Sequence, residues 1–269
     1  MPTARLLLVR CGCRTPADRH LYHERVTPVV LGELIRAAAG RAGLDSASLP
    51  GTVPVELVHD LDRSEYATPL ALSIAGVTAT APLSLARRIA DQLLDDPTFA
   101  QVDVAAPGFV NFRLTPGARA GLIRGLTRPE LPPADSLPDL VNWPDRVATN
   151  PYYLVQLACA RMHRLARHSA QIDVQAAPEL LELAEHRCDV QVIRQLTQRL
   201  RPGPGLLARL SRVAEAVHAW ADEPACSVVP VGHAAVQDGH RARLALVGPA
   251  ITVLTAGCHA LGIDAPERI

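Results

Sequence analysis

Three side chains that could hold an unpaired nucleic-acid base alternate along residues 109–114. In an extended strand, Phe109, Asn111 and Arg113 share one face, and the apolar residues between them share the other. An aromatic ring, an amide and a guanidinium are the groups with which proteins stack a splayed-out base, hydrogen-bond its edge and bind its phosphate. The alternative is structural, with Phe109 packed under a neighbouring helix and Asn111 paired with the backbone. The pattern leaves both interpretations open.

A second candidate is an arginine within the apolar side of a predicted helix. This helix begins at Asn150, has apolar residues at positions 154, 157, 158, 162 and 165, and places Arg161 inside that arc. A guanidinium in such a position needs a carboxylate, carbonyl groups or a phosphate. The partner is either a phosphate of a nucleic acid or an acid of a neighbouring helix, such as Glu182 or Glu185.

The charge composition limits the chemistry of the chain. It has 27 acidic and 27 basic residues, and every basic residue is an arginine. Without lysine there is no P-loop lysine, no Schiff-base lysine and no ammonium clamp on ATP phosphates. Zero net charge argues against strong nonspecific nucleic-acid binding but permits binding through a local surface. Arg164, Arg167 and His168 add positive charge to the helix of Arg161, although such a run is more often a solvated face.

Other chemistry has little support. Cys11, Cys13, His20 and His23 have a spacing that fits no zinc motif, and the histidines show no catalytic-triad signature. We therefore predict no catalytic residue, no metal and no cofactor. The six cysteines indicate reduced thiols. The N-terminal apolar run is too short for a signal peptide, and no apolar run approaches bilayer length, so we expect a cytoplasmic protein without a membrane partner.

The elements that carry these residues fall into two regions. The first, residues 27–126, predicts an α+β domain with a small sheet. Helices are expected over 27–41, over 66–74, from Pro82 and after Pro116, and strands over 53–58, 102–104 and 110–114. Residues 1–26 have no clear period, and we interpret them as a leader, with disorder as one possibility.

The second region, residues 150–269, predicts only helices. Asn150 is a good helix cap and Pro151 a good first residue. A stripe of apolar residues from 244 to 261 is long enough to pack into a bundle, and Pro249 is expected to start or kink its helix. Five prolines punctuate residues 127–149, which we interpret as a linker.

Four segments, in the same order, resemble a known family. Residues 102–114, VDVAAPGFVNFRL, resemble the V-E-V-A-G-P-G-F-I-N-F-x-L end of the N-terminal domain of arginyl-tRNA synthetases. Residues 65–72, EYATPLAL, are similar to the D-Y-A-T-N-x-A-L of the same domain. Residues 150–161, NPYYLVQLACAR, resemble the N-P-x-Y-Y-x-Q-Y-A-H-A-R that opens the family's helical anticodon-binding (DALR) domain. The C-terminal LGIDAPERI is similar to L-G-I-x-A-P-E-R-M.

The resemblance implies a tRNA-binding role. In the family, the N-terminal domain touches the tRNA elbow, which implies Phe109, Asn111 and Arg113 as contacts there. The helical domain faces the anticodon arm, which implies contacts by a second set of residues: Tyr153, Gln156, Arg161 and Arg164. The partner is then a tRNA, with tRNA-Arg one candidate.

The chain also departs from the family. Leu154, Leu157 and Cys159 replace two tyrosines and a histidine of the helical motif, which weakens the expected reading of the anticodon. The family's catalytic domain, with its H-I-G-H and K-M-S-K motifs, would lie where this chain has only the linker. We therefore expect a non-catalytic tRNA-binding protein. The alternatives are a protein-interaction scaffold that no longer binds tRNA, or the accessory half of a split arginine–tRNA ligase.

Overall fold

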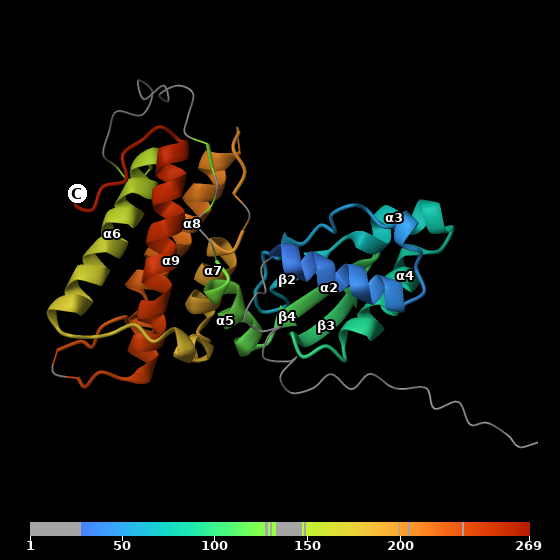
Figure 1. The fold of residues 1–269 in the computed structure, drawn as a ribbon, viewed down its shortest axis with the longest axis horizontal. Helices are drawn as coiled ribbons and strands as arrows, with labels where there is room; N and C mark the ends of the chain where they lie inside the picture. The colour runs from blue at the N-terminus through green and yellow to red at the C-terminus, as the bar shows by residue number, and fades with distance from the viewer. Residues whose placement is uncertain are drawn as a thin grey trace, which may run out of the picture.

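Two structural units follow one another along the chain, an α+β unit and a helical unit (Figure 1). The structure is a computed structural model that describes residues 28–126, 129, 131–132, 147, 149–198, 200–203, 205–232 and 234–269. The predicted leader, residues 1–26, lies outside the described residues, as does most of the predicted linker, residues 127–149. The coarse fold class, a small sheet with helices followed by helices, is confirmed.

The α+β unit contains a four-stranded antiparallel sheet in the order β1-β2-β4-β3. Its elements are α2 (Pro28–Arg41), η1 (Ser46–Ser48), β1 (Glu56–Leu57), β2 (Tyr66–Thr68), α3 (Leu70–Thr78), α4 (Pro82–Leu93), β3 (Phe99–Ala105), β4 (Phe109–Leu114) and α5 (Pro116–Arg124). Helices α2, α3 and α4 pack on one face of the sheet in a common hydrophobic core.

The alternation predicted for residues 109–114 is present in β4. Val110, Phe112 and Leu114 are buried, whereas the residues between them are half-buried. The Phe112 ring stacks on Tyr66 at a centroid distance of 5.8 Å and meets Phe99 edge to face at 5.2 Å. Each fully buried side chain of this size contributes about 1.5–3 kcal/mol, so this face of the sheet anchors the unit.

Two predictions for the α+β unit were wrong in detail. The helix predicted over residues 66–74 begins only at Leu70, because Tyr66–Thr68 form strand β2 and pair with β4. Pro69 favours an extended conformation for the residue before it, which separates the strand from the helix. The strand predicted over residues 53–58 is reduced to Glu56–Leu57, with Pro54 unable to donate a ladder hydrogen bond.

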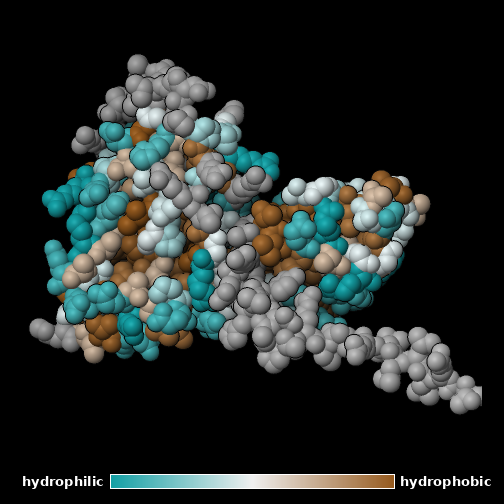
Figure 2. All heavy atoms as spheres, viewed as in Figure 1, coloured by the Kyte–Doolittle hydropathy of each residue, from teal (hydrophilic) through white to brown (hydrophobic). Residues whose placement is uncertain are grey.

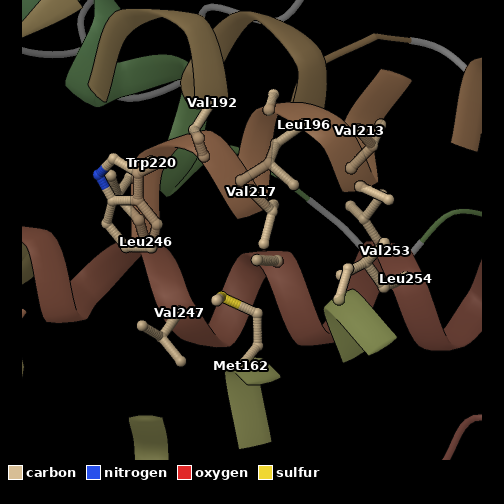
Figure 3. Packing of buried hydrophobic residues seen from close by; sticks show 14 of the residues in the cluster. Met162, Val192, Leu196, Val213, Val217, Trp220, Leu246, Val247, Val253 and Leu254 are labelled. Atoms are coloured by element: carbon tan, nitrogen blue, oxygen red, sulfur yellow. The ribbon is translucent and has the colours of Figure 1, made fainter. Parts of the chain in front are cut away.

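In the described part of the helical unit there are four α-helices and two short 3₁₀ segments. These are α6 (Pro151–Gln171), η3 (Pro178–Leu183), α7 (Arg187–Leu196), α8 (Leu206–Asp222), η4 (Pro224–Cys226) and α9 (Asp238–Ala260). The predicted cap is confirmed, since the Asn150 side chain accepts hydrogen bonds from the backbone N–H groups of Tyr152 and Tyr153. Figure 3 shows part of the core, in which Met162 of α6, Val217 of α8 and Trp220 belong to one buried cluster.

Helix α9 runs through the centre of this unit. It continues without interruption through Pro249, so the expectation that Pro249 starts the helix was wrong. Among the described helices, α9 alone has a length and composition that would allow it to cross a membrane, and 61% of its apolar window is buried inside the protein. Such burial is typical of the core helix of a bundle.

Helix α5 joins the two hydrophobic cores. Ala118 and Leu122 pack into the core of the sheet unit, whereas Ala120 and Ile123 pack into the core of the helical unit. Ala118 and Leu122 are four residues apart and Ala120 and Ile123 are three apart, so the members of each pair lie on the same side of the helix. The two pairs therefore occupy two different sides of α5. This helix therefore fixes how the two units sit against each other.

Gly108 in the turn before β4 provides a test of the packing that positions Phe109. A Cβ atom at this position would lie 2.8 Å from Pro82 Cβ and 3.0 Å from the Pro82 carbonyl carbon. We expect Gly108→Ala to lower the free energy of unfolding by about 1–3 kcal/mol, because the backbone at the start of α4 must move. Urea unfolding measures the effect.

The matched control is Gly76→Ala on α3, where a Cβ meets nothing within 4 Å. Because alanine is the better helix former, this change should leave stability unchanged or raise it by up to about 1 kcal/mol. Equal unfolding curves for the two variants would contradict the close approach of the turn to α4.

Candidate nucleic-acid interface

The face of β4 opposite the core carries the predicted base-binding residues. Phe109 and Asn111 are half-buried, and Phe109 lies outside the hydrophobic core of its unit. Asn111 makes no side-chain hydrogen bond within the described part of the chain. The structural alternative, in which both side chains serve internal packing, thus loses support. A ring and an amide edge remain available on this face.

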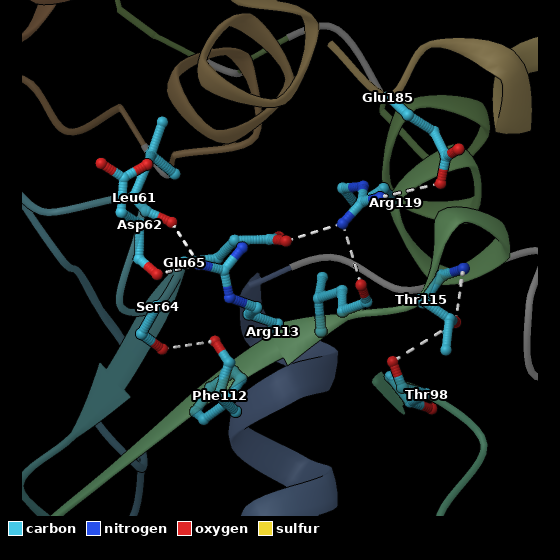
Figure 4. A network of polar contacts seen from close by, with 12 residues as sticks. Leu61, Asp62, Ser64, Glu65, Thr98, Phe112, Arg113, Thr115, Arg119 and Glu185 are labelled. Carbon is cyan, nitrogen blue, oxygen red and sulfur yellow. Dashed lines mark hydrogen bonds and ion pairs between the residues drawn. The ribbon is translucent and has the colours of Figure 1, made fainter. Parts of the chain in front are cut away.

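Arg113 of the same face is already engaged. Its Nη2 donates to the backbone carbonyl of Leu61 at 2.6 Å and to that of Asp62 at 2.5 Å (Figure 4). The guanidinium therefore holds the loop between β1 and β2. Sequence reasoning placed Arg113 on the correct face but did not foresee these two carbonyl groups.

Carboxylate and amide groups of β3 complete this face. Asp103 pairs directly with Asn111 and Gln101 with Arg113, so their side chains lie on the same side of the sheet. Asp103 and Gln101 are exposed, and the Gln101 amide donates to the Asp103 carboxylate. The sheet face thus offers a ring, amides, the Asp103 carboxylate and the Arg113 guanidinium, part of whose hydrogen-bonding capacity is used. The carboxylate and amides suit the edges of bases.

A groove of about 420 Å³ on the helical unit gathers the positive charge. It is bounded by α6, α8 and the C-terminal segment, and four arginines line it: Arg161, Arg164, Arg167 and Arg268. In Figure 1, α6 runs along the side of the helical unit away from the sheet, and hydrophilic residues cover much of that edge in Figure 2. Steps of three residues bring Arg161, Arg164 and Arg167 onto neighbouring turns of α6.

Arg161 has a carboxylate partner, but not one of the two that were suggested. Its guanidinium binds the Asp222 carboxylate at the end of α8, whereas Glu185 pairs with Arg119. Its Nη1 also lies 3.4 Å from His218 Nδ1. The Arg161 side chain remains 20% exposed and Asp222 67% exposed, so the pair lies at the surface of the groove. The Arg161 hydrogen bond lowers the pKa of Asp222.

His218 contributes polarity to the groove. Burial, together with the charge of Arg161, lowers its pKa, against the opposing effect of a hydrogen bond to the Leu154 carbonyl. This shift favours the neutral ring. A proton on Nε2, which lies 3.4 Å from that carbonyl, leaves Nδ1 to accept from Arg161.

The other predicted residues of α6 differ in availability. Arg164 is exposed and has no hydrogen bond or ion pair among the described residues. Tyr153 is half-buried 11 residues before it, about three helical turns away on the same face. Gln156, in contrast, donates to the backbone carbonyl of Asp264 at 3.0 Å and holds the C-terminal segment. Arg167 does the same through the Glu267 carbonyl, also at 3.0 Å.

A buried ion pair at the junction positions the two surfaces. Arg119 of α5 binds Glu65 at 2.6 Å and Glu185 of the helical unit at 3.6 Å (Figure 4). The Glu65 side chain is only 2% exposed. Burial raises the pKa of Glu65, and the charge of Arg119 opposes that shift. Without its arginine, the carboxylate would be a buried, uncompensated charge.

Two arginines of α7 also make contacts across the junction. Arg187 at the start of α7 binds Asp62 at 3.6 Å. Arg194 donates to the Val58 carbonyl, and its guanidinium lies 5.8 Å from the centroid of the Tyr66 ring. None of these long-range contacts has a signal in local sequence spacing.

Loss of the junction pair should destabilise the protein strongly. We expect Arg119→Ala to lower the free energy of unfolding by about 3–5 kcal/mol near neutral pH, because Glu65 stays buried without a partner. The pKa of Glu65 in the folded state then rises further above its unfolded value. The folded state therefore takes up a proton as the pH falls, and the deficit shrinks as the pH is lowered from neutral toward the ordinary pKa of glutamate.

Denaturant unfolding across this pH range measures the effect. Arg187→Ala is the control, since it removes an exposed pair and should cost no more than about 1 kcal/mol at any pH. A pH-independent loss in Arg119→Ala would show that Glu65 is not the group responsible.

Comparison with known proteins agrees with this architecture for the first unit. Residues 30–114, from α2 to the end of β4, match the family described as the arginyl tRNA synthetase N terminal domain. The chain is also 36% identical over 106 residues to the arginine–tRNA ligase of Frankia alni. That alignment covers 38% of this chain and 19% of the length of the relative. The chain is therefore related to arginyl-tRNA synthetases, and its residues 30–114 match the N-terminal domain of that family.

Proposed function

We propose that this chain is a non-catalytic tRNA-binding protein that contacts the tRNA elbow with the sheet unit and the anticodon arm with the helical unit. The observation that carries the proposal is the arginine-lined groove beside α6, on the helix whose sequence resembles the family's anticodon-binding motif. The relationship to an arginine–tRNA ligase supplies the RNA partner, with tRNA-Arg one candidate.

The groove suits a phosphate backbone. Arg164 and Arg268 are exposed cations, and Arg161 and Arg167 line the same groove with part of their hydrogen-bonding capacity already used. Guanidinium groups bind phosphates through two parallel hydrogen bonds, which adds geometric selectivity to the charge. Because the whole chain is neutral, affinity must come from this local set and should fall steeply with salt.

The sheet face suits bases. Phe109 offers a stacking surface, and Asn111 beside Asp103 offers hydrogen-bond acceptors and donors for the edge of an unpaired base. The two surfaces would thus divide base recognition and backbone binding between them.

The non-catalytic part of the proposal rests on what the chain holds between its two units. Only residues 115–149 separate the matched N-terminal domain from the start of the helical unit, and α5 already occupies part of that stretch. The chain has no lysine to serve a K-M-S-K loop. The sheet formed by the described residues is antiparallel throughout, unlike the parallel sheet of a nucleotide-binding domain.

A second candidate function is a protein-interaction scaffold. The ion pair between Arg161 and Asp222 favours it, because a carboxylate already occupies the arginine that the family resemblance assigns to RNA. An accessory half of a split arginine–tRNA ligase is a third candidate. Pyrophosphate exchange by the purified chain would reveal such catalytic capacity.

Variants of Asp222 and Arg161 test whether Arg161 binds RNA or serves only a structural ion pair with Asp222. If Arg161 binds a phosphate, Asp222 competes with it. Asp222→Asn should then strengthen tRNA binding about 1.5- to 5-fold, the contribution of an exposed ion pair. Arg161→Ala should weaken binding about tenfold, since a charged hydrogen bond is lost. Gel-shift titrations with total tRNA at two salt concentrations measure both.

The control for a general charge effect is Asp91→Asn on α4, an exposed acid on the helix-covered side of the sheet unit. It should leave the affinity unchanged. Unchanged affinity in both groove variants would favour the scaffold, and no binding even at low salt would remove the tRNA proposal.

The sheet face is tested by removing the ring alone. Phe109→Leu keeps an apolar side chain but loses stacking, which contributes about 1–3 kcal/mol per base, so tRNA binding should weaken at least about fivefold. Val77→Ala on α3 is the control, because Val77 is 72% exposed and lies away from this face. A variant that binds like the parent protein would show that the sheet does not contact RNA.

A further inference from the structure

Three metal-ligating side chains lie close together where the start of α7 meets the segment after α8. His186 and Cys188 flank the start of α7, and Cys226 ends η4, which follows α8. Their ligand atoms all lie within 4.8 Å of one another, and His186 Nδ1 lies 3.1 Å from Cys226 Sγ. The cluster brings together residues from two segments about forty positions apart.

A buried carboxylate holds this cluster in place. Asp189 is completely buried and accepts a hydrogen bond from the backbone N–H of His186 at 3.1 Å. It also accepts from Trp220 Nε1 of α8 at 2.7 Å and from Arg243 Nε of α9 at 3.1 Å. Three helices thus fix the backbone that carries His186 and Cys188. Outer contacts of this kind are what keep metal ligands aligned in established sites.

The donor set points to one class of metal. Two thiols and an imidazole are soft and borderline ligands, suited to zinc, whereas magnesium and calcium take oxygen ligands. A tetrahedral zinc site has bonds of about 2.3 Å to sulfur and about 2.0 Å to nitrogen. Its ligand atoms are then roughly 3.5–3.8 Å apart, so side-chain rotation within the present cluster is sufficient.

The surroundings allow a metal to enter. Cys226 is buried, but His186 and Cys188 are each partly exposed. Glu223, the half-buried cap of η4, acts electrostatically on Cys188, and a water or this carboxylate would complete the tetrahedron. Binding through Nδ1 would replace the bond that this atom accepts from the Cys188 N–H at 3.3 Å. The other hydrogen bond of the cap, from the His186 N–H to the Asp189 carboxylate, would remain.

We propose that His186, Cys188 and Cys226 bind a zinc ion. The ion would tie the start of α7 to the segment after α8. On either side of His186 stand Glu185 and Arg187, which contact Arg119 and Asp62 at the junction with the sheet unit. A metal here would therefore restrict the motion of residues 185–187, through which the helical unit contacts the sheet unit. This inference is independent of tRNA binding.

Cobalt(II) binding to the reduced full chain tests the proposal. The background variant Cys11→Ser/Cys13→Ser removes the leader cysteines, which lie outside the described residues. We expect one cobalt per chain, with a thiolate-to-cobalt charge-transfer band and tetrahedral visible bands, displaced by one equivalent of zinc. Cys188→Ser should lower the charge-transfer intensity by about half, because one of two thiolates is lost.

Matched variants guard against misfolding. His186→Asn keeps a good helix cap and removes the imidazole, so zinc affinity should fall at least about tenfold. Cys258→Ser changes a buried cysteine outside the cluster and should leave the cobalt spectrum unchanged. Circular dichroism checks that each variant retains its helices.

Two results would overturn the zinc site. One is a background protein without a charge-transfer band, or with the same band in Cys188→Ser as in Cys258→Ser. The other is an intramolecular Cys188–Cys226 disulfide, detected by intact mass under mild oxidation, in a chain whose reduced form binds neither cobalt nor zinc. Either outcome would leave the cluster as a packing and capping feature.

Discussion

The buried ion pair between Arg119 and Glu65 is the constraint on which the arrangement of this protein depends. It lies where β2, the end of β4 and α5 meet, and its second contact reaches Glu185 of the helical unit. Helix α5 contributes apolar side chains to both cores around it. A ligand that spans both units needs a fixed spacing between two surfaces. The buried pair contributes to this by fixing α5 against the sheet, because separating it would leave a carboxylate without water or partner, and α5 in turn packs into the core of the helical unit.

The arginines of this protein differ in how far internal partners occupy their guanidinium groups. Arg119 is nearly buried and locked, Arg113 is tied to two backbone carbonyls, Arg161 shares an exposed carboxylate, and Arg164 is free among the described residues. The series runs from a guanidinium that serves only the structure to one that is available to bind a ligand. In a chain with zero net charge, internal acids set how much of each guanidinium remains for a phosphate. Under the proposed function, a nucleic acid would displace or bypass Asp222, which favours a ligand of defined shape over any polyanion.

Local patterns predicted the elements whose signal is contained within them. The alternation of β4 placed Phe112 in the core and Phe109 outside it, and the Asn150 cap fixed the start of α6. Contacts between distant residues had no such signal. Tyr66–Thr68 form a strand because β4 pairs with them, and the acid that meets Arg161 is 61 residues away. Likewise Cys226 joins His186 only after α8 has turned back. These are tertiary effects that override or escape local propensity.

Asp189 connects the candidate metal cluster to the same junction. Its carboxylate accepts hydrogen bonds from the start of α7, from α8 and from α9, and His186, whose backbone N–H it binds, stands between Glu185 and Arg187, two residues that contact the sheet unit. Neither of those contacts is strong on its own, since both involve exposed side chains at 3.6 Å. Their contribution to holding the two units together depends on a rigid backbone around Glu185 and Arg187. The rigidity of the α7 start therefore decides how firmly the helical unit presents its arginines relative to the sheet.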